Sequence, residues 1–257
     1  MALFVVTPLV LVLIFAFTAQ DGRFTLDNFK NMTAYESVFV RSLLLALIAT
    51  SICLVAGYPL AYILSRESPE FQKISMLLIM LPMWMNFLLR TYAWMSIIEN
   101  TGLLNRLLTF LKLPTVNIIN TEAAVVLGMV YNYLPFMILP IYSVIIKIEK
   151  HTIEAAQDLG ANPVLVFRRI IFPLSLPGVL SGITMVFVPS VSTFIISKLL
   201  GGGSTLLLGD LIEMQFLGNA YNPHLGSAIS LVMMIIVMAC MAIMNRFGEG
   251  EEDVVML

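Results

Sequence analysis

The chain is 257 residues long; 59% of its residues are hydrophobic, only 12% are charged, and the mean hydropathy is +0.94. A soluble domain carries about one quarter charged residues, so this composition excludes an ordinary water-soluble protein. The formal net charge of -2 and the lack of any basic run exclude a nucleic-acid partner. We therefore expect a polytopic membrane protein.

Several stretches are apolar enough to cross a bilayer as helices. A spanning helix needs about 20 apolar residues, because every backbone polar group in lipid must be paired inside the segment. Runs such as residues 231–238 are apolar on every face, which favours helices over strands that alternate apolar and polar side chains. We predict an all-α fold with six transmembrane helices in a single transmembrane domain, residues 1–257. The six predicted spans are Ala2–Ala19, Ser42–Leu64, Ile74–Ile98, Ala123–Ile146, Leu174–Ile196 and Leu225–Asn245.

Positive charges in the loops indicate the orientation of these spans. Cytoplasmic loops of membrane proteins are enriched in Lys and Arg. One side holds seven such residues and the other side holds four, which predicts that both termini are cytoplasmic. Arg41 and Lys198 lie at the ends of spans and are expected to reach to the interface. The seven are Arg66, Lys73, Lys147, Lys150, Arg168, Arg169 and Arg246, and the four are Arg23, Lys30, Arg106 and Lys112.

The longest polar insertion on the predicted cytoplasmic side covers residues 147–173. Thr152 is a suitable N-cap for a short helix, and Gly160 suits the left-handed residue that ends one. Asn162 followed by Pro163 predicts a fresh helix start. The loop is therefore predicted to form a helix, a turn and a second helix on the membrane surface. The residue pattern alone leaves two roles open, an amphipathic linker on lipid headgroups or a helix that docks into a groove.

The same loop resembles the EAA loop of ABC importer permeases. The resemblance rests on residues 154–156 (Glu-Ala-Ala), on Gly160 after three intervening residues, and on Ile170 and Pro173 after nine more. The family pattern has leucine where this chain has Phe172, which keeps a large apolar side chain. In that family the loop forms a coupling helix that fits a cleft of the cytoplasmic ATPase. The resemblance thus implies an ATPase-coupling role for Glu154, Ala155, Ala156, Asp158 and Gly160.

This likeness extends over nearly the whole chain and is strongest to the PotB-type spermidine/putrescine permeases. It implies a MetI-like fold, alternating access, and a path for polyamines, with related permeases for other small solutes as an alternative. It also implies an ABC ATPase subunit in two copies, a second permease, identical or different, and an extracytoplasmic substrate-binding protein. The strings that carry it are Leu26-Asp27-Asn28-Phe29, Ala46-Leu47-Ile48-Ala49-Thr50, Gly57-Tyr58-Pro59-Leu60-Ala61, Leu81-Pro82 with Trp84, Asn86, Arg90 and Tyr92, Leu134-Pro135-Phe136-Met137, and Gln215-Phe216-Leu217.

A polyamine is a flexible multivalent cation, so its path should offer carboxylates and aromatic faces. Asp210 and Glu213 are three residues apart in a segment too short and too charged to be a span, and they would share one helix face. The alternatives are solvated loop acids, interfacial aromatic belts and hydrogen bonds between helices. The candidate substrate-path residues are Trp84, Tyr92, Trp94, Tyr131, Tyr133, Asp210 and Glu213.

Arg90 is the one charge well inside a predicted span. Burying an unpaired charge in lipid is costly, so an ionisable residue at this depth indicates a function. A cation would repel a polyamine. We therefore expect Arg90 to pair with a carboxylate, in this chain or in a partner, and to hold or gate the outer half of the bundle.

Gly178 and Gly182 form a small-xxx-small pair in the fifth predicted span. Such pairs let helix backbones approach closely. The sequence leaves open whether the partner helix belongs to this chain or to a second permease.

An ion-coupled secondary transporter or channel is the alternative from another functional class. It would need coupling carboxylates deep in the spans, and the predicted spans contain none. The sequence has no GxxxxGK[ST], HExxH, GxSxG or CxxC motif, and Cys53 and Cys240 lie in apolar stretches. We therefore expect a non-catalytic transport subunit without cofactor or metal.

Overall fold

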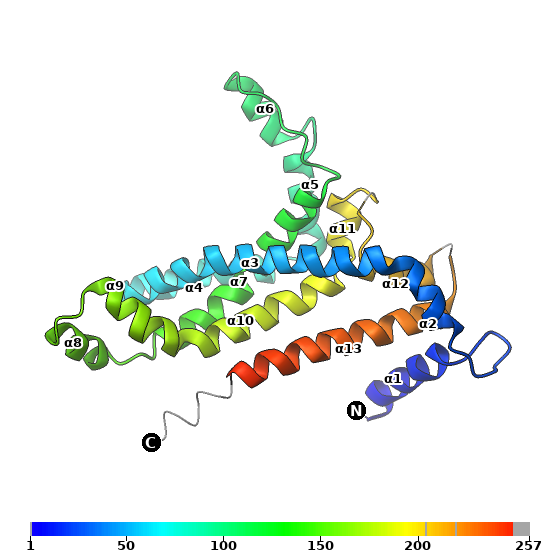
Figure 1. Cartoon of the computed structure of the whole chain (residues 1–257). Helices are drawn as coiled ribbons and strands as arrows, with labels where there is room; N and C mark the ends of the chain where they lie inside the picture. Colours follow the sequence, from blue (N-terminus) through cyan, green and yellow to red (C-terminus); the bar gives the residue numbers. More distant parts are fainter. Residues whose placement is uncertain (1, 204, 219, 249–257) are drawn as a thin grey trace. The chain divides into compact units, whose positions relative to one another are not determined.

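The computed structural model describes residues 2–203, 205–218 and 220–248 (Figure 1). Across these residues the chain is helical, and apart from an isolated bridge between Thr18 and Phe24 they contain no β-structure. The predicted all-α class is confirmed. In chain order the α-helices are α1 (Ala2–Ala16), α2 (Asp27–Met32), α3 (Glu36–Arg66), α4 (Pro69–Trp84), α5 (Phe87–Ile98), α6 (Leu103–Phe110), α7 (Glu122–Ile145), α8 (Lys150–Asp158), α9 (Pro163–Val166), α10 (Phe172–Ser192), α11 (Ile195–Leu200), α12 (Leu208–Leu217) and α13 (Pro223–Gly248).

Long apolar helices account for most of the predicted spans. The second, fourth, fifth and sixth predicted spans each match a helical segment that is long and apolar enough to cross a membrane. The first predicted span forms only the shorter α1, whose apolar part is Val6–Ala16, so the total of six spans stays a prediction. Within the described residues the four long segments are Asp27–Arg66, Glu122–Ile145, Pro163–Ser192 and Pro223–Met244.

The third predicted span is broken rather than continuous. Helix α4 and the segment Phe87–Phe110 meet at an angle of 94°. Pro82 has no backbone N–H to continue the α4 hydrogen bonds, and Met85 is extended, with a ψ of 149°. Asn86 Oδ1 then accepts a hydrogen bond from the Leu88 N–H at 2.8 Å, as an N-cap does. If this bent pair is one span, it is the fifth candidate among the described residues.

Contacts between residues divide the chain into two compact units. The first comprises Met1–Leu47, Thr91–Gly128 and Pro189–Cys240, and the second comprises Ile48–Arg90, Met129–Val188 and Met241–Leu257. The long helices α3, α7, α10 and α13 each contribute residues to both units. The single domain over residues 1–257 stays a prediction, and its last nine positions, 249–257, lie outside the described residues.

In the first unit, buried polar side chains satisfy backbone groups at helix ends. Asn28 Nδ2 donates to the carbonyl oxygens of Ala16 and Thr18, both at 3.0 Å, which ties α2 to the end of α1. Ser42 Oγ on α3 accepts from the Leu208 N–H at 2.8 Å. That N–H belongs to the first turn of α12 and has no partner within its own helix. Helix α3 therefore holds the start of α12.

In the second unit, α7 and α10 pack closely at two glycines. A Cβ added to Gly178 would lie 2.8 Å from the Pro140 carbonyl oxygen, and one added to Gly182 would lie 2.8 Å from Met137 Sδ. Both distances are shorter than real Cβ contacts. The Gly178–Gly182 pair is therefore used for packing within this chain.

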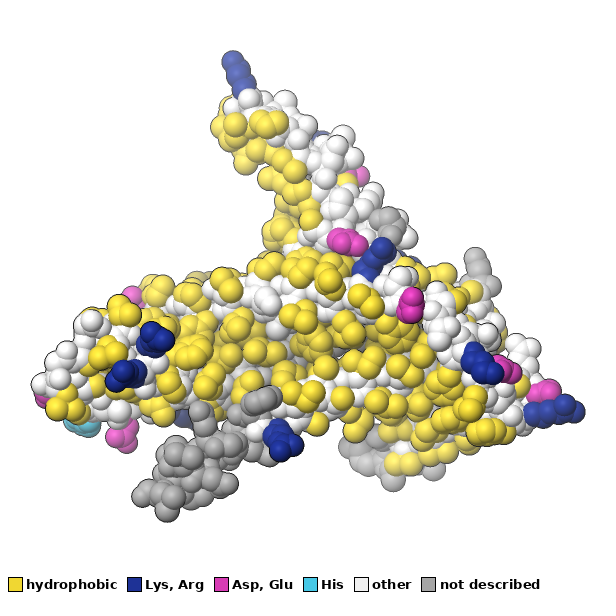
Figure 2. All heavy atoms as spheres, in the orientation of Figure 1, with side chains coloured by type: hydrophobic (Ala, Val, Ile, Leu, Met, Phe, Trp, Pro, Cys, Tyr) yellow, Lys and Arg dark blue, Asp and Glu magenta, His cyan; other side chains and the backbone are white. Residues whose placement is uncertain are grey.

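The surface of the long helices is apolar. Figure 2 shows hydrophobic side chains over most of the visible face, with Lys, Arg, Asp and Glu confined to a few places. Val55 in the middle of α3 is 74% exposed. Contiguous apolar surface of this extent marks contact with something other than water. Lipid satisfies that requirement, since the helices pair their own backbone groups.

Replacing Gly178 with alanine should destabilise the protein by about 1–3 kcal/mol, because the added methyl group overpacks the α7–α10 contact. Thermal unfolding of the detergent-solubilised protein, followed by tryptophan fluorescence, measures this change. Ser181→Ala, at an exposed position of the same helix, is the matched control. It should leave the midpoint temperature of unfolding unchanged within experimental error. Equal transitions for Gly178→Ala and the control would contradict the close packing.

Candidate functional site

The polar loop of the second unit begins with α8, and its start differs from the prediction. Helix α8 begins at Lys150 with Glu149 as N-cap, and no side chain caps it. The Thr152 N–H donates to the Glu149 carbonyl at 3.2 Å, so Thr152 lies inside the first turn and its predicted role as N-cap is wrong. The cause is the backbone before it: Glu149 is extended, with a ψ of 132°, and the helix starts directly afterwards.

The end of α8 is formed as predicted. Gly160 has a φ of +84°, the left-handed conformation that glycine adopts at low cost. Its N–H donates to the Gln157 carbonyl at 2.9 Å, and the Ala161 N–H donates to the Ala156 carbonyl at 3.0 Å. These two bonds constitute a Schellman motif, which satisfies carbonyls that the helix end leaves unpaired. The chain therefore turns sharply after α8.

A second helix starts immediately after this turn. Asn162 Oδ1 accepts from the Leu165 N–H at 2.8 Å, and Pro163 occupies the first helical position of α9. Both features match the prediction from the Asn-Pro pair. The predicted helix, turn and helix are thus present in residues 150–166.

One side of α8 lines a cavity. The cavity has a volume of about 530 Å³ and is bounded by the end of α3, the start of α4, the end of α7 and one face of α8. The α8 residues that line it are Lys150, Ile153, Glu154 and Gln157, which are spaced as neighbours on a helix face. Glu154 of the Glu-Ala-Ala sequence therefore lies at this cavity, although its side chain is 63% exposed.

The rest of the loop presents small and apolar side chains to the outside. Ala155 and Asp158 are exposed and do not line the cavity. Leu159 at the end of α8 is 90% exposed, and Val164 on α9 is 73% exposed. Uncovered leucine and valine side chains beside an alanine suit the docking of another protein surface.

An aromatic cluster attaches this loop to the long helices of the second unit. A π-helical turn, Phe167–Ile171, joins α9 to α10. The Phe167 ring lies 5.8 Å from that of Tyr58 and 5.3 Å from that of Tyr62, both edge-on, and Tyr58 Oη lies 2.7 Å from Ser175 Oγ on α10. The loop is therefore in direct contact with α3, which in turn is hydrogen-bonded to α10.

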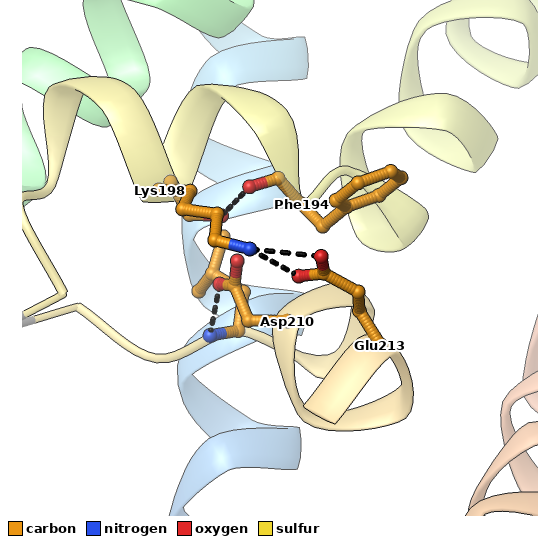
Figure 3. Close-up of polar contacts among 6 residues, drawn as sticks. Phe194, Lys198, Asp210 and Glu213 are labelled. Atoms are coloured by element: carbon orange, nitrogen blue, oxygen red, sulfur yellow. Dashed lines mark hydrogen bonds and ion pairs between the residues drawn. The ribbon is translucent and has the colours of Figure 1, made fainter. Parts of the chain in front are cut away.

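The two predicted acids lie on α12 in the first unit, and both point toward Lys198 (Figure 3). Asp210 is buried, and its Oδ2 accepts from the Leu207 N–H at 2.9 Å, so it closes the start of α12. Burial raises the pKa of the Asp210 carboxyl, and hydrogen bonds with Ser197 and Leu207 oppose that rise. Glu213 has a different partner: Lys198 Nζ lies 2.8 Å from its Oε1 and 2.7 Å from its Oε2.

The predicted aromatic residues are distributed over both units, whereas the two acids belong to the first. In the first unit, Tyr92 is exposed and Trp94 is half-buried. In the second, Trp84 is exposed, Tyr131 is half-buried and Tyr133 is buried. Their assignment to the substrate path stays a prediction.

Arg90 does not have the expected carboxylate partner within the described part of the chain. It is buried, and its Nε and Nη1 atoms have no hydrogen-bond partner there. The guanidinium carbon lies 6.0 Å from the centre of the Phe87 ring, one turn earlier on α5. Pairing with a carboxylate of a partner subunit stays a prediction.

Two ion pairs were not predicted from the sequence. Lys198 pairs with Glu213, and Arg41 Nε lies 3.2 Å from Glu122 Oε1, so neither cation merely reaches to the interface. The partners of each pair lie on different helices, and their opposite charges were the only signal in the sequence that could have indicated the pairing.

Comparison with known families and relatives gives a consistent result. A family model described as "Binding-protein-dependent transport system inner membrane component" matches residues 54–249. The chain is 39% identical over 245 residues to the spermidine/putrescine transport system permease protein PotB of Haemophilus influenzae, covering 91% of this chain and 85% of that protein. It is 37% identical over 247 residues to PotB of Escherichia coli, covering 92% and 90%.

Solved structures share the fold at low sequence identity. A bacterial ABC transporter involved in the import of the acidic polysaccharide alginate contains a chain with a TM-score of 0.78 and 17% identity, covering 96% of this chain and 90% of that one. The MetNI methionine ABC transporter, in inward-facing conformations, gives a TM-score of 0.64 and 16% identity, covering 86% and 97%. These likenesses confirm the predicted MetI-like fold.

Replacing Gly160 with valine should loosen the end of α8, because a β-branched residue in the left-handed conformation costs about 1–2 kcal/mol. Hydrogen–deuterium exchange measured on a peptide covering residues 156–165 should become about fivefold to thirtyfold faster. Gly160→Asn is the matched control, since asparagine tolerates this conformation and no atom lies within 4 Å of an added Cβ. Equal exchange in both variants would show that the turn does not depend on glycine.

Proposed function

Since this chain belongs to the family of binding-protein-dependent transport system inner membrane components, we propose that it forms the membrane path for polyamines in an ABC importer. It is a transport subunit and not an enzyme. The observation that supports polyamines as substrates is the identity of 37–39% to two spermidine/putrescine permeases over more than 90% of this chain. ABC permeases of other solutes are related at lower identity, such as a probable sulfate permease at 27%.

The loop of α8 and α9 is the proposed docking site for the ATPase subunit. Ala155 and Asp158 face outward with Leu159 and Val164, which gives a small central side chain flanked by uncovered apolar ones. Glu154 lines the cavity behind the helix, Ala156 is half-buried, and Gly160 ends the helix. The aromatic contacts of Phe167 carry the motion of the docked ATPase to α3 and α10.

The complete importer that we propose contains a second permease, two copies of the ATPase subunit and an extracytoplasmic substrate-binding protein. The family description supports the binding protein directly. With both termini in the cytoplasm, α8 lies on the ATPase side, while α11 and α12 lie on the side of the binding protein. Closure of the two ATPase subunits then moves α8. The long helices rearrange, so that the substrate path opens alternately to the two sides of the membrane.

The proposed path for the substrate uses carboxylates and aromatic rings on the extracytoplasmic half. Glu213 attracts the ammonium groups, and Asp210 holds α12 in place. Aromatic faces bind alkylammonium groups by cation–π attraction, about 0.5–2 kcal/mol each. Arg90 pairs with a carboxylate of the second permease and stabilises the broken span. The proposed aromatic residues are Trp84, Tyr92, Trp94, Tyr131 and Tyr133.

Reconstitution tests the substrate. The permease is incorporated into liposomes with its ATPase, second permease and binding protein, and uptake of radiolabelled spermidine is followed with ATP inside. Spermidine and putrescine should stimulate ATP hydrolysis and accumulate against a gradient, whereas sulfate and methionine should do neither. Uptake without any ATPase subunit, or stimulation by sulfate but not by spermidine, would contradict the proposal.

A bulky side chain at Ala155 tests the docking surface. Ala155→Gln should reduce ATPase association at least about tenfold, because the larger side chain separates surfaces that an alanine allows to touch. Co-purification or surface plasmon resonance with the ATPase measures the change. Gln157→Ala, on the cavity side of the same helix, is the control and should retain association. The reverse ranking of these two variants would place the docking face on the other side of α8.

A further inference from the structure

Lys198 on α11 forms an ion pair with Glu213. Glu213 is the residue that we propose attracts the ammonium groups of the substrate. The Lys198 Nζ lies within 2.8 Å of both carboxylate oxygens of Glu213 (Figure 3). A lysine side chain is an alkyl chain ending in a primary ammonium group, and so is each end of a polyamine. The contact between the Lys198 ammonium and the Glu213 carboxylate is therefore the same kind of contact that one end of a polyamine would make with Glu213.

The two partners differ in their freedom to move. The Lys198 side chain is 60% exposed, whereas the Glu213 side chain is 24% exposed. Helix α12, which carries Glu213, is held at its first turn by two buried hydrogen bonds, from Leu207 to Asp210 and from Leu208 to Ser42. The helix that carries Glu213 is thus held in place, and the Glu213 carboxylate is less exposed than the lysine that pairs with it.

We propose that Lys198 is a tethered competitor that occupies the ammonium site on Glu213 and is displaced by an end of the incoming polyamine. This inference rests on the proposed function, because it takes a polyamine to be the substrate. Asp210 is a positioning residue in this arrangement and does not itself need to touch the substrate.

The energetics of an exposed ion pair favour such an exchange. A pair of this kind contributes little net stability, since water and salt screen it and the lysine loses rotamer freedom. Displacing Lys198 therefore costs little free energy, because an ammonium group of the polyamine takes its place on the Glu213 carboxylate. The tether gives Lys198 a high effective concentration, so a solute with one weakly bound charge competes poorly. A polyamine adds further contacts through its other ammonium groups and can compete.

Removal of the competing charge is the first test, in the reconstituted importer with the binding protein held at one concentration. Lys198→Met keeps the length and apolar character of the side chain but removes the ammonium group. The spermidine concentration that gives half-maximal uptake should fall about two- to fivefold, the range expected for loss of an exposed pair. Glu213→Gln should raise that concentration, and Lys198→Met should have no further effect in the Glu213→Gln background.

Arg41→Met is the matched control for these variants. It breaks another exposed ion pair of the same unit, Arg41 with Glu122, and it should leave the half-saturating concentration unchanged. If Arg41→Met lowers the concentration as much as Lys198→Met does, the effect is one of net charge and the tethered-competitor role is overturned.

Chemical cross-linking provides a second measurement that does not depend on turnover. A water-soluble carbodiimide activates the Glu213 carboxyl, and the neutral Lys198 amine attacks it to form an amide, releasing a urea. Peptide mass spectrometry of the assembled importer should detect this amide. Spermidine should suppress it and yield a spermidine amide on Glu213 instead, whereas sodium chloride of equal ionic strength should not.

The outcomes separate the two proposals. If the wild-type importer takes up no polyamine, the proposed function fails and this inference fails with it. If wild-type uptake is normal but Lys198→Met does not change half-saturation and spermidine does not displace the amide, only the tethered-competitor role is overturned. A shift of half-saturation together with loss of the amide supports it.

Discussion

The structure depends first on the requirement that backbone polar groups be paired where water is absent. In a bilayer only helices achieve this within one segment. The consequence is visible on α3, α7, α10 and α13, which are apolar along their length and carry apolar side chains on exposed faces as well as buried ones. Polar side chains are scarce, and some of the buried ones have a defined task, such as Ser42 at the start of α12.

Function is then expected where this pairing is interrupted, because helix ends expose backbone groups and admit polar side chains. The α4–α5 break at Asn86 brings the buried Arg90 onto the following turn. The Schellman turn at Gly160 leaves Leu159 uncovered, and the π-helical turn at Phe167 ties the same loop to Tyr58 and Tyr62. The two proposed sites, the docking loop and the Lys198–Glu213 pair, both lie at such interruptions.

The two sites use different physical interactions. The docking loop offers shape and apolar surface, which suits a large and repeated contact with another protein. The pair of Lys198 and Glu213 offers one exchangeable charge contact, which suits a small cation that must bind and then leave. Asp210 illustrates the division of labour between neighbouring acids, since its buried carboxyl supports the helix that carries the exposed charge pair.

Local features of the sequence determined the helical class, the places of the long apolar helices, the left-handed stop at Gly160 and the helix start at Asn162-Pro163. Each depends on interactions among residues a few positions apart, so the residue types alone indicate them. The tertiary structure decided the partner of Lys198, the burial of Asp210, the cavity behind α8 and the use of Gly178 for packing within the chain. These depend on residues that are distant in sequence, and apolar periodicity carries no information about which helices meet. The 94° bend after α4 lies between the two cases: Pro82 and Asn86 permit it locally, but similar prolines in α7 leave that helix unbroken, so packing decides which site bends.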